Sequence, residues 1–247
     1  MYEETAPPGV LAGVARCLWR SAVNAPKRIV PDGCLDLVAG NDEVFVAGPD
    51  TGAWSSVTRP GVVLRGLRFV PGLAPAVLGV AADELRDRRV PLGELWGHEG
   101  ELVTEQVLEG SLSLGAVVAS RMADATPPDP AVRALIRRLE AGPSRVTPAA
   151  GQLTLGERQL RRRFVQAVGY GPATYLRVTR LQRAIELAPR TPGLAALAAV
   201  AGYADQAHLS RDCRDLTGLT PRAYFVTRST VDRSSPEVAA QRESRSA

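Results

Sequence analysis

The chain has 247 residues, of which 45% are hydrophobic and 23% are charged, as is typical of a globular protein with one large or two ordinary domains. No stretch approaches the roughly 20 apolar residues of a membrane helix, and the acidic start is unlike a signal peptide. Three widely spaced cysteines, Cys17, Cys34 and Cys213, argue against a disulfide framework. We therefore expect a cytoplasmic protein without a membrane segment.

Charge is divided unevenly along the chain. Residues 1–130 carry 11 basic and 17 acidic side chains, whereas residues 131–228 carry 16 basic and 6 acidic ones. All basic residues of the second segment are arginines, whose planar guanidinium binds phosphates and guanine edges through paired hydrogen bonds. This segregation predicts that the second segment contacts a polyanion and that the first does not.

Short β-like runs separated by turn residues dominate the region from Lys27 to Val70. The signal GND at 40–42 predicts a hairpin between strands at about 34–39 and 43–47. Broken alternation in the run VVLRGLRFV indicates a bulge at Gly66. The runs are RIV at 28–30, CLDLVAG at 34–40, EVFVAG at 43–48 and VVLRGLRFV at 62–70.

Helical patterns follow at 81–88, 98–110 and 111–123, where apolar residues recur every three or four positions. We therefore expect residues 1–125 to form a β-rich, barrel-like domain capped by helices, and a pair of these helices offers a surface for a homodimer. The three prolines of TPPDP predict a linker at 126–130. The polar stretch 229–247 predicts a disordered tail.

An internal repeat at an offset of 49 residues marks the positive segment. The stretches 160–176 and 209–225 align without a gap. In each copy a glycine suits a left-handed helix end, a proline restarts the chain, and a tyrosine packs the next helix back. The matched pairs are Leu160 with Leu209, Arg162 with Arg211, Gly169 with Gly218, Pro172 with Pro221, and Tyr175 with Tyr224.

The second copy has the pattern of a helix-turn-helix unit. A helix of small apolar residues from Leu194 precedes a turn at Gly202, and Asp205 is a good N-cap for a second helix that ends near Leu216. In such a unit the second helix lies in the DNA major groove. Leu209 and Cys213 should face inward. Helical spacing places Gln206, Ser210 and Arg211 on the outward side.

The first copy has its recognition helix at 156–169, preceded by a short helix in TPAAGQLT with a turn near Thr154. Leu160 and Phe164 should face inward, and Arg158, Arg161 and Arg162 outward.

A connecting helix is expected at 172–188, with Arg177 and Arg180 on one face and Val178, Leu181, Ile185 and Ala188 on another. Its length suits two recognition helices about 34 Å apart, one turn of duplex DNA. The whole is an α+β protein whose residues 131–228 form an all-α domain of two helix-turn-helix units.

These motifs resemble the AraC/XylS family of bacterial transcription regulators. The span DQAHLSRDCRDLTGLTPRAYF, preceded by LAALAAVAGYA, is similar to the signature of that family's second helix-turn-helix. The resemblance covers about 145–226 and implies a regulator whose partners are double-stranded DNA and, for an activator, RNA polymerase. It implies base contacts at Arg158, Arg162, Gln206, His208 and Arg211. For Arg177 and Arg180 we expect structural or phosphate-facing roles, and for His208 a DNA contact rather than a metal ligand.

The stretches RIVPDGCLDLVAG, VAGPDT and ELRDRRVPLGELWG resemble a small β-barrel domain that precedes AraC-type units, mostly in high-GC bacteria. This resemblance implies a module for a small-molecule effector or for dimerisation. Cys34, Asp32, Asp36 and Asp50 are the candidate effector-binding residues. Turn chemistry explains PDG and GPD equally well, and a buried strand cysteine is the simpler interpretation of Cys34.

No enzyme motif is present, so we expect no catalytic residue, no cofactor and no metal. Two histidines, His98 and His208, are too few for a typical zinc site. The alternative hypothesis is a DNA-binding protein whose first domain has a cysteine-based enzymatic or redox-sensing activity. Dimerisation without a ligand is the third hypothesis for residues 1–125.

Overall fold

The computed structural model describes residues 2–22, 26–40, 42–56, 61–123, 125–142 and 156–225. The chain forms two compact units, Met1–Val178 and Thr179–Ala247, and each is described by itself. The division falls inside one helix, so the first recognition helix belongs to the same unit as the β-sheets. The predicted division into domains 1–125 and 131–228 stays a prediction. The expected short helix in TPAAGQLT, the turn near Thr154 and the tail 229–247 lie outside the described residues.

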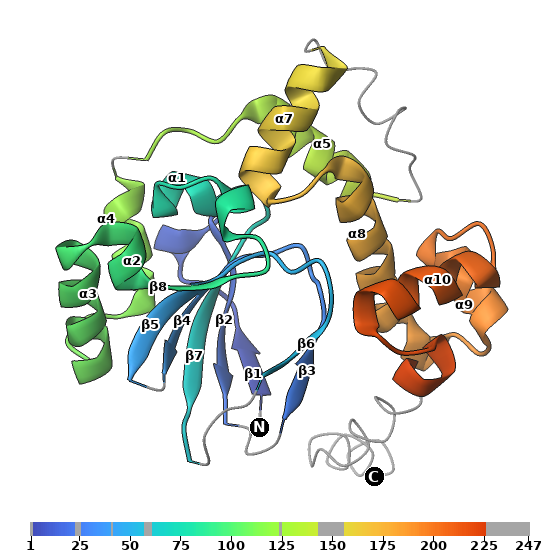
Figure 1. Ribbon diagram of the computed structural model, residues 1–247, viewed down its shortest axis with the longest axis horizontal. Coiled ribbons are helices and arrows are strands. Elements are labelled where there is room, and N and C mark those ends of the chain that lie inside the picture. The colour runs from blue at the N-terminus through green and yellow to red at the C-terminus, as the bar shows by residue number, and fades with distance from the viewer. Residues whose placement is uncertain are drawn as a thin grey trace, which may run out of the picture. The chain divides into compact units, whose positions relative to one another are not determined.

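The first unit is built on a six-stranded antiparallel sheet with the order β1-β2-β7-β4-β5-β8 (Figure 1). Its strands are β1 (Tyr2–Thr5), β2 (Ala15–Ser21), β4 (Asp36–Gly40), β5 (Glu43–Ala47), β7 (Leu64–Phe69) and β8 (Arg89–Pro91). The predicted hairpin is confirmed, because β4 and β5 pair from Asp36–Ala47 to Gly40–Glu43. Strands β1, β2 and β8 were not predicted.

A second sheet contains β3 (Lys27–Ile29) and β6 (Trp54–Ser56). Among the described strands both sheets are open, so the barrel-like closure expected from the sequence is not formed. The physical reason lies at the edges of the large sheet. Both edge strands, β1 and β8, are short, and helix α2 begins directly after β8, at Leu92.

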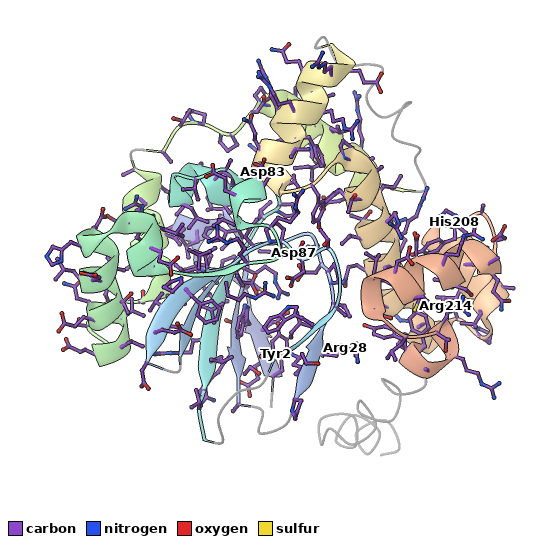
Figure 2. The ribbon with its side chains drawn as sticks, in the orientation of Figure 1. Tyr2, Arg28, Asp83, Asp87, His208 and Arg214 are labelled. Atoms are coloured by element: carbon purple, nitrogen blue, oxygen red, sulfur yellow. The ribbon has the colours of Figure 1, made fainter. Side chains whose placement is uncertain are left out.

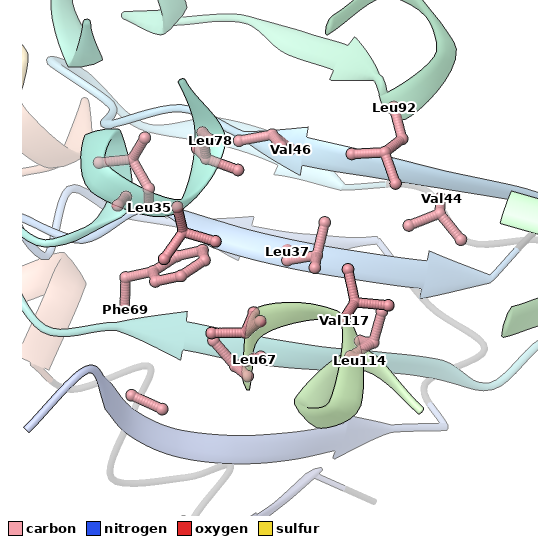
Figure 3. Packing of buried hydrophobic residues seen from close by; sticks show 14 of the residues in the cluster. Leu35, Leu37, Val44, Val46, Leu67, Phe69, Leu78, Leu92, Leu114 and Val117 are labelled. Carbon is pink, nitrogen blue, oxygen red and sulfur yellow. The ribbon is translucent and has the colours of Figure 1, made fainter. Parts of the chain in front are cut away.

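Alternation along the strands of the large sheet separates its two faces. Leu37, Val46 and Leu67 are fully buried in an apolar core, in which Leu114 and Val117 of a covering helix also take part (Figure 3). Their neighbours in the chain point to the opposite face, since successive side chains of a strand alternate. On that face lie Asp36, Phe45 and Arg68, which line a cavity described below.

The core face is covered by helices that follow the strands in the chain (Figure 1). They are α1 (Ala74–Leu78), α2 (Leu92–Trp96), α3 (His98–Glu109) and α4 (Leu114–Met122). The helices expected at 98–110 and 111–123 are therefore confirmed. The helix expected at 81–88 is only a short 3-10 turn, η2 (Ala82–Leu85), because Asp87 adopts a left-handed φ of 57°. The Asp87 carboxylate accepts hydrogen bonds from the backbone and the hydroxyl of Thr51.

The expected bulge at Gly66 is wrong. Gly66 pairs in regular register with Trp19 of β2 and Val38 of β4, and the register shift lies in β2, between Ala15 and Cys17. Gly66 is needed for another reason, because a Cβ there would lie 2.1 Å from the indole of Trp19. The break in alternation at Gly66 therefore marks the place where the Trp19 ring packs on the strand.

The helical part begins with α5 (Pro130–Glu140) and α7 (Glu157–Val168), followed by α8 (Pro172–Leu187). The second unit contains the end of α8, η3 (Ala188–Arg190), α9 (Leu194–Ala201) and α10 (Gln206–Thr217). The recognition and connecting helices predicted from the repeat are confirmed as helices. No helix in the described part of the chain is long and apolar enough to cross a membrane.

Candidate nucleic-acid interface and effector cavity

Helix α7 has one buried face and one cationic face. Leu160 and Phe164, four residues apart, are buried as predicted. Arg158, Arg161 and Arg162 are exposed. The neighbouring Arg163 instead donates to Asp129 Oδ2 at 3.0 Å, and Asp129 also caps α5 through the backbone N–H groups of Ala131 and Val132. The exposed arginines of α7 are therefore those that the sequence singled out.

Helices α9 and α10 form the second helix-turn-helix, as the sequence predicts. Gly202 takes a left-handed φ of 87° behind α9, and the Asp205 side chain accepts a hydrogen bond of 2.7 Å from the His208 N–H. Leu209 and Cys213 are fully buried. These contacts fix the first turn of α10, the part of a recognition helix that reaches base edges.

The outward side of α10 presents Gln206 and Arg211, which are both exposed. Ser210 is half-buried, and its hydroxyl donates to the Gln206 carbonyl at 2.8 Å. Arg214, about one turn beyond Arg211, is also exposed (Figure 2). It was not predicted as a site residue, although it lies three residues after Arg211 in the sequence.

His208 is held inside the second unit. Its ring lies edge-on to Tyr203, with centroids 5.1 Å apart, and its Nε2 is 3.7 Å from Asp212 Oδ2. Its side chain is 29% exposed, so the ring is partly accessible to solvent.

Helix α8 buries Tyr175, Val178, Leu181 and Ala184 along one face. The expected continuation of this face through Ile185 and Ala188 is shifted, because both are half-buried and Ala184 takes the core position. Arg177 and Arg180 are half-buried and engaged in interactions within the protein.

All four candidate effector residues line a single cavity of about 130 Å³ in the first unit. Strands of both sheets contribute to its walls: Trp19, Phe45 and Arg68 come from the large sheet, and Lys27 and Trp54 from the small one. Tyr2, labelled beside Arg28 of β3 in Figure 2, is a further wall.

The cavity holds two similar groups of aspartate, arginine and tryptophan. In the first, Arg68 donates to both Asp36 oxygens at 3.0 and 2.9 Å, and the Trp19 indole N–H donates to Asp36 at 3.0 Å. Burial raises the pKa of Asp36, and the Arg68 charge opposes that rise. The carboxylate of Asp32 also lies 3.3 Å from Arg68 Nε.

In the second group, Arg89 donates to both Asp50 oxygens at 2.8 Å. The Trp54 indole N–H donates to Asp50 at 2.9 Å, and the Arg89 guanidinium lies 4.0 Å from the centroid of the Trp54 ring. Burial raises the pKa of Asp50, whereas the hydrogen bonds from Arg89 lower it. Both carboxylates thus have their oxygens occupied by donors.

Cys34 is buried beside this cavity. Its N–H donates to Asp32 Oδ1 at 2.9 Å, and Arg16 Nη1 lies 3.6 Å from its sulfur. Burial, and then the charge of Asp32, raise the pKa of the Cys34 thiol well above its usual value. A thiol in this state is a poor nucleophile.

Comparison with known proteins identifies the helical region. Residues 149–226 match the model of a helix-turn-helix domain, and residues 3–91 match that of a domain of unknown function, DUF6597. The C-terminal part of the chain is an AraC-type helix-turn-helix domain. AraC-type domains bind DNA in transcription regulators, and the chain is accordingly a DNA-binding transcription regulator. No curated protein matches the sequence.

Solved structures of ToxT from Vibrio cholerae are similar to this chain at low identity. One crystal structure of ToxT from strain O395 has a TM-score of 0.48 and 8% identity, covering 91% of this chain and 97% of that one. A second, bound to (E)-4-(8-methylnaphthalen-1-yl)but-3-enoic acid, has a TM-score of 0.44 and 10% identity, covering 91% and 98%. A third, bound to unsaturated fatty acid, has a TM-score of 0.45 and 10% identity, covering 86% and 94%.

The first half of the AraC-type domain packs directly on two loops that line the cavity. In the turn between α7 and α8, a Cβ on Gly169 would lie 2.3 Å from Pro49, next to Asp50. The Gly169 carbonyl accepts a hydrogen bond of 3.4 Å from Arg86. On the other loop, a Cβ on Gly33 would lie 2.9 Å from the Tyr175 ring. The loops of Asp32 and Asp50 are thus both in contact with the chain that follows α7.

Sequence reasoning found the carboxylates of the cavity and missed their partners. Trp19, Trp54, Arg68 and Arg89 lie up to 39 residues away from the aspartates that they contact. The PDG and GPD motifs mark turns, but only strand pairing decides which arginine faces which turn. The presence of Arg68 within the strand-like run VVLRGLRFV was the available signal.

Proposed function

We propose that the chain is a sequence-specific regulator that reads double-stranded DNA with α7 and α10 in successive major grooves. The observation that carries this proposal is the division of both helices into a buried face and an exposed polar face. Arg158, Arg161 and Arg162 on α7, and Gln206 and Arg211 on α10, are the side chains available to DNA. The charge of the second segment agrees, because phosphate contacts supply most of the affinity of such proteins.

The proposed roles differ along the two helices. Arg211 and Arg162 hold equivalent positions in the two copies and suit guanine edges, while Gln206 suits adenine. Arg158 and Arg161 add base or phosphate contacts from α7. His208 and Ser210, both partly buried, contribute phosphate or water-mediated contacts. Arg177 and Arg180 position α8 or contact phosphates of the duplex.

The cavity of the first unit is the proposed effector site of this regulator. Cys34, Asp32, Asp36 and Asp50 all lie on it, and the loops of Asp32 and Asp50 contact the turn that ends α7. A ligand that shifts either loop therefore changes the support of the first recognition helix. This contact favours an effector module over a module for dimerisation alone.

A binding-site selection with the full-length chain, followed by variants of α10, tests the DNA proposal. Arg211→Ala should weaken binding to the selected site by about 1–3 kcal/mol and relax preference at one base pair, because a bidentate contact to one base is lost. Arg65→Ala, which removes an exposed arginine of β7, is the matched control and should leave binding unchanged. An equal loss for Arg211→Ala on random DNA would assign Arg211 to phosphate. A selection that enriches no motif would contradict sequence-specific reading.

A further inference from the structure

The cavity between the sheets selects its ligand first by size. Its volume of about 130 Å³ is below the 300 to 1,000 Å³ of common ligand pockets. An apolar protein cavity of about 150 Å³ accepts benzene. The space inside the cavity therefore holds one ring with a small substituent.

The walls of the cavity favour a flat molecule. Four aromatic side chains, Tyr2, Trp19, Phe45 and Trp54, line it. The two indoles are fixed in place by their hydrogen bonds to Asp36 and Asp50. Rigid rings pack against another ring with little loss of side-chain entropy.

The cavity lining carries equal numbers of acidic and basic side chains, and these side chains are engaged in contacts with their neighbours. Asp32, Asp36 and Asp50 face the cavity together with Lys27, Arg68 and Arg89. The two arginines are held in bidentate pairs at 2.8–3.0 Å, and Lys27 Nζ lies 3.9 Å from the centroid of the Tyr2 ring. A charged ligand would have to displace one of these contacts and would leave a partly buried charge without its partner, which is costly. A neutral ligand meets no such cost.

One polar atom of the lining still lacks a partner. The Nε of Arg89 is a buried N–H group with no hydrogen-bond acceptor among the described residues. An unsatisfied buried donor is unfavourable, so a ligand whose oxygen reaches this N–H group gains a hydrogen bond that the free protein lacks.

We infer that the cavity binds a neutral, planar, single-ring molecule that carries a hydrogen-bond acceptor, of the aromatic amide or ketone class. This inference rests on the proposed effector role of the cavity and deepens it by naming the ligand class. The cavity thereby discriminates by charge among molecules of equal shape.

Three molecules of nearly identical shape test the inference with the full-length chain. Benzamide is neutral, benzoate is an anion and benzamidinium is a cation at pH 7. Tryptophan fluorescence and thermal shift should detect benzamide at a dissociation constant about tenfold or more below those of the two ions. Equal or tighter binding of either ion overturns the inference, as does a lack of benzamide binding.

Variants assign the signal to the cavity. Ala47→Leu and Ser56→Leu each add volume at the lining and should abolish benzamide binding. Ala116→Leu, on the exposed side of α4, is the matched control and should bind benzamide as the wild type does. Unchanged binding by both folded cavity variants would place benzamide elsewhere and overturn the inference.

A DNA-binding assay separates this inference from the proposed function. Tight benzamide binding that leaves the affinity for the selected DNA site unchanged contradicts the effector role and retains the ligand class. Absence of benzamide binding, with DNA binding intact, contradicts the ligand class and leaves the DNA-reading proposal standing.

Discussion

The ring of Tyr175 lies against Gly33, so closely that a Cβ on that glycine would be 2.9 Å from the Tyr175 Cε2 atom. Tyr175 belongs to the helix after the first recognition helix, and Gly33 lies between Asp32 and Cys34 at the cavity. The Tyr175 hydroxyl donates a hydrogen bond of 2.6 Å to Glu140 of α5. One tyrosine of α8 therefore joins the cavity loop to α5.

Gly33→Ala should destabilise the protein for two reasons. The glycine has a φ of 84°, which is unfavourable for alanine, and the added methyl group would displace the Tyr175 ring. The first effect alone costs about 1 kcal/mol, and the second adds to it. Thermal unfolding should show a lower midpoint.

Gly13→Ala is the matched control for this substitution. Its φ is 78°, and nothing lies within 4 Å of the Cβ position, so it carries the backbone strain without the collision. A midpoint for Gly33→Ala equal to that of Gly13→Ala would show that Tyr175 yields without cost, and the proposed link from cavity to helix would lose its main contact.

Arg68→Ala should be strongly destabilising at neutral pH. Asp36 would keep its buried position and lose the cation that occupies both of its oxygens, and breaking a buried pair in this way costs about 3–5 kcal/mol. Urea unfolding at pH 7 measures the loss. The double variant Arg68→Met with Asp36→Leu should be less destabilised, because no unpaired charge remains.

The loss in free energy of unfolding caused by Arg68→Ala should become smaller as the pH falls. Burial already raises the pKa of Asp36, and Arg68 is the group that opposes the rise, so its removal raises that pKa further. A carboxyl group whose pKa is higher in the folded state stabilises the fold when protonated, and this stability is lost as the pH rises through the folded pKa. A loss in free energy of unfolding that grows toward acidic pH would show that the unpaired charge of Asp36 is not its cause.

Asp129→Ala should loosen the start of α5 and its link to α7. The carboxylate caps the helix through two backbone N–H groups and pairs with Arg163. Loss of a cap costs about 1 kcal/mol. Burial opposes the ionisation of Asp129, but hydrogen bonds from Arg163 and from the backbone lower its pKa. The ionised carboxylate therefore stabilises the fold above the usual pKa of a free carboxyl group, and this stabilisation is lost as the pH falls through the lowered pKa.

The comparison for Asp129→Ala is Asp205→Ala, which removes the cap of α10 in the second unit. Both variants should unfold earlier than the wild type in urea at pH 7. The difference between wild type and Asp129→Ala should decrease below about pH 4. A difference independent of pH down to acid unfolding would show that the charge of Asp129 contributes nothing.

The elements that the sequence predicted well are those governed by local signals. The α10 helix follows from the Asp205 cap, the apolar spacing of Leu209 and Cys213, and the left-handed Gly218, all within one short segment. The β4–β5 hairpin follows from its turn. Strands β1 and β2 were missed because their alternation is weak, and they are stabilised by pairing with each other and with β7.

The cavity shows the same limit at the level of single residues. Asp32 and Asp50 lie in the two turn motifs, and Asp36 lies in the strand-like run after the first. The groups that determine their chemistry are brought to them by the sheet register. Arg68 faces Asp36 because β7 pairs with β4, and Arg89 lies beside Ala47 because β8 pairs with β5. No spacing in the sequence predicts these contacts, since they depend on the order of the strands in the sheet.

The salt dependence of DNA binding tests whether the exposed arginines of α7 contact the duplex. Each phosphate contact contributes about −0.9 to the slope of log affinity against log salt concentration. The triple variant Arg158→Ala, Arg161→Ala, Arg162→Ala should flatten the slope by about 1 to 3 and weaken binding to random DNA at low salt. The selected site should lose more affinity than random DNA, because the proposed contact of Arg162 with a guanine edge is also lost. Because these side chains are exposed, thermal unfolding should change little. Arg20→Ala with Arg65→Ala, which removes exposed arginines from the sheet, should keep the wild-type slope. A wild-type slope in the triple variant would mean that α7 stays off the DNA, and reading would then be confined to α10.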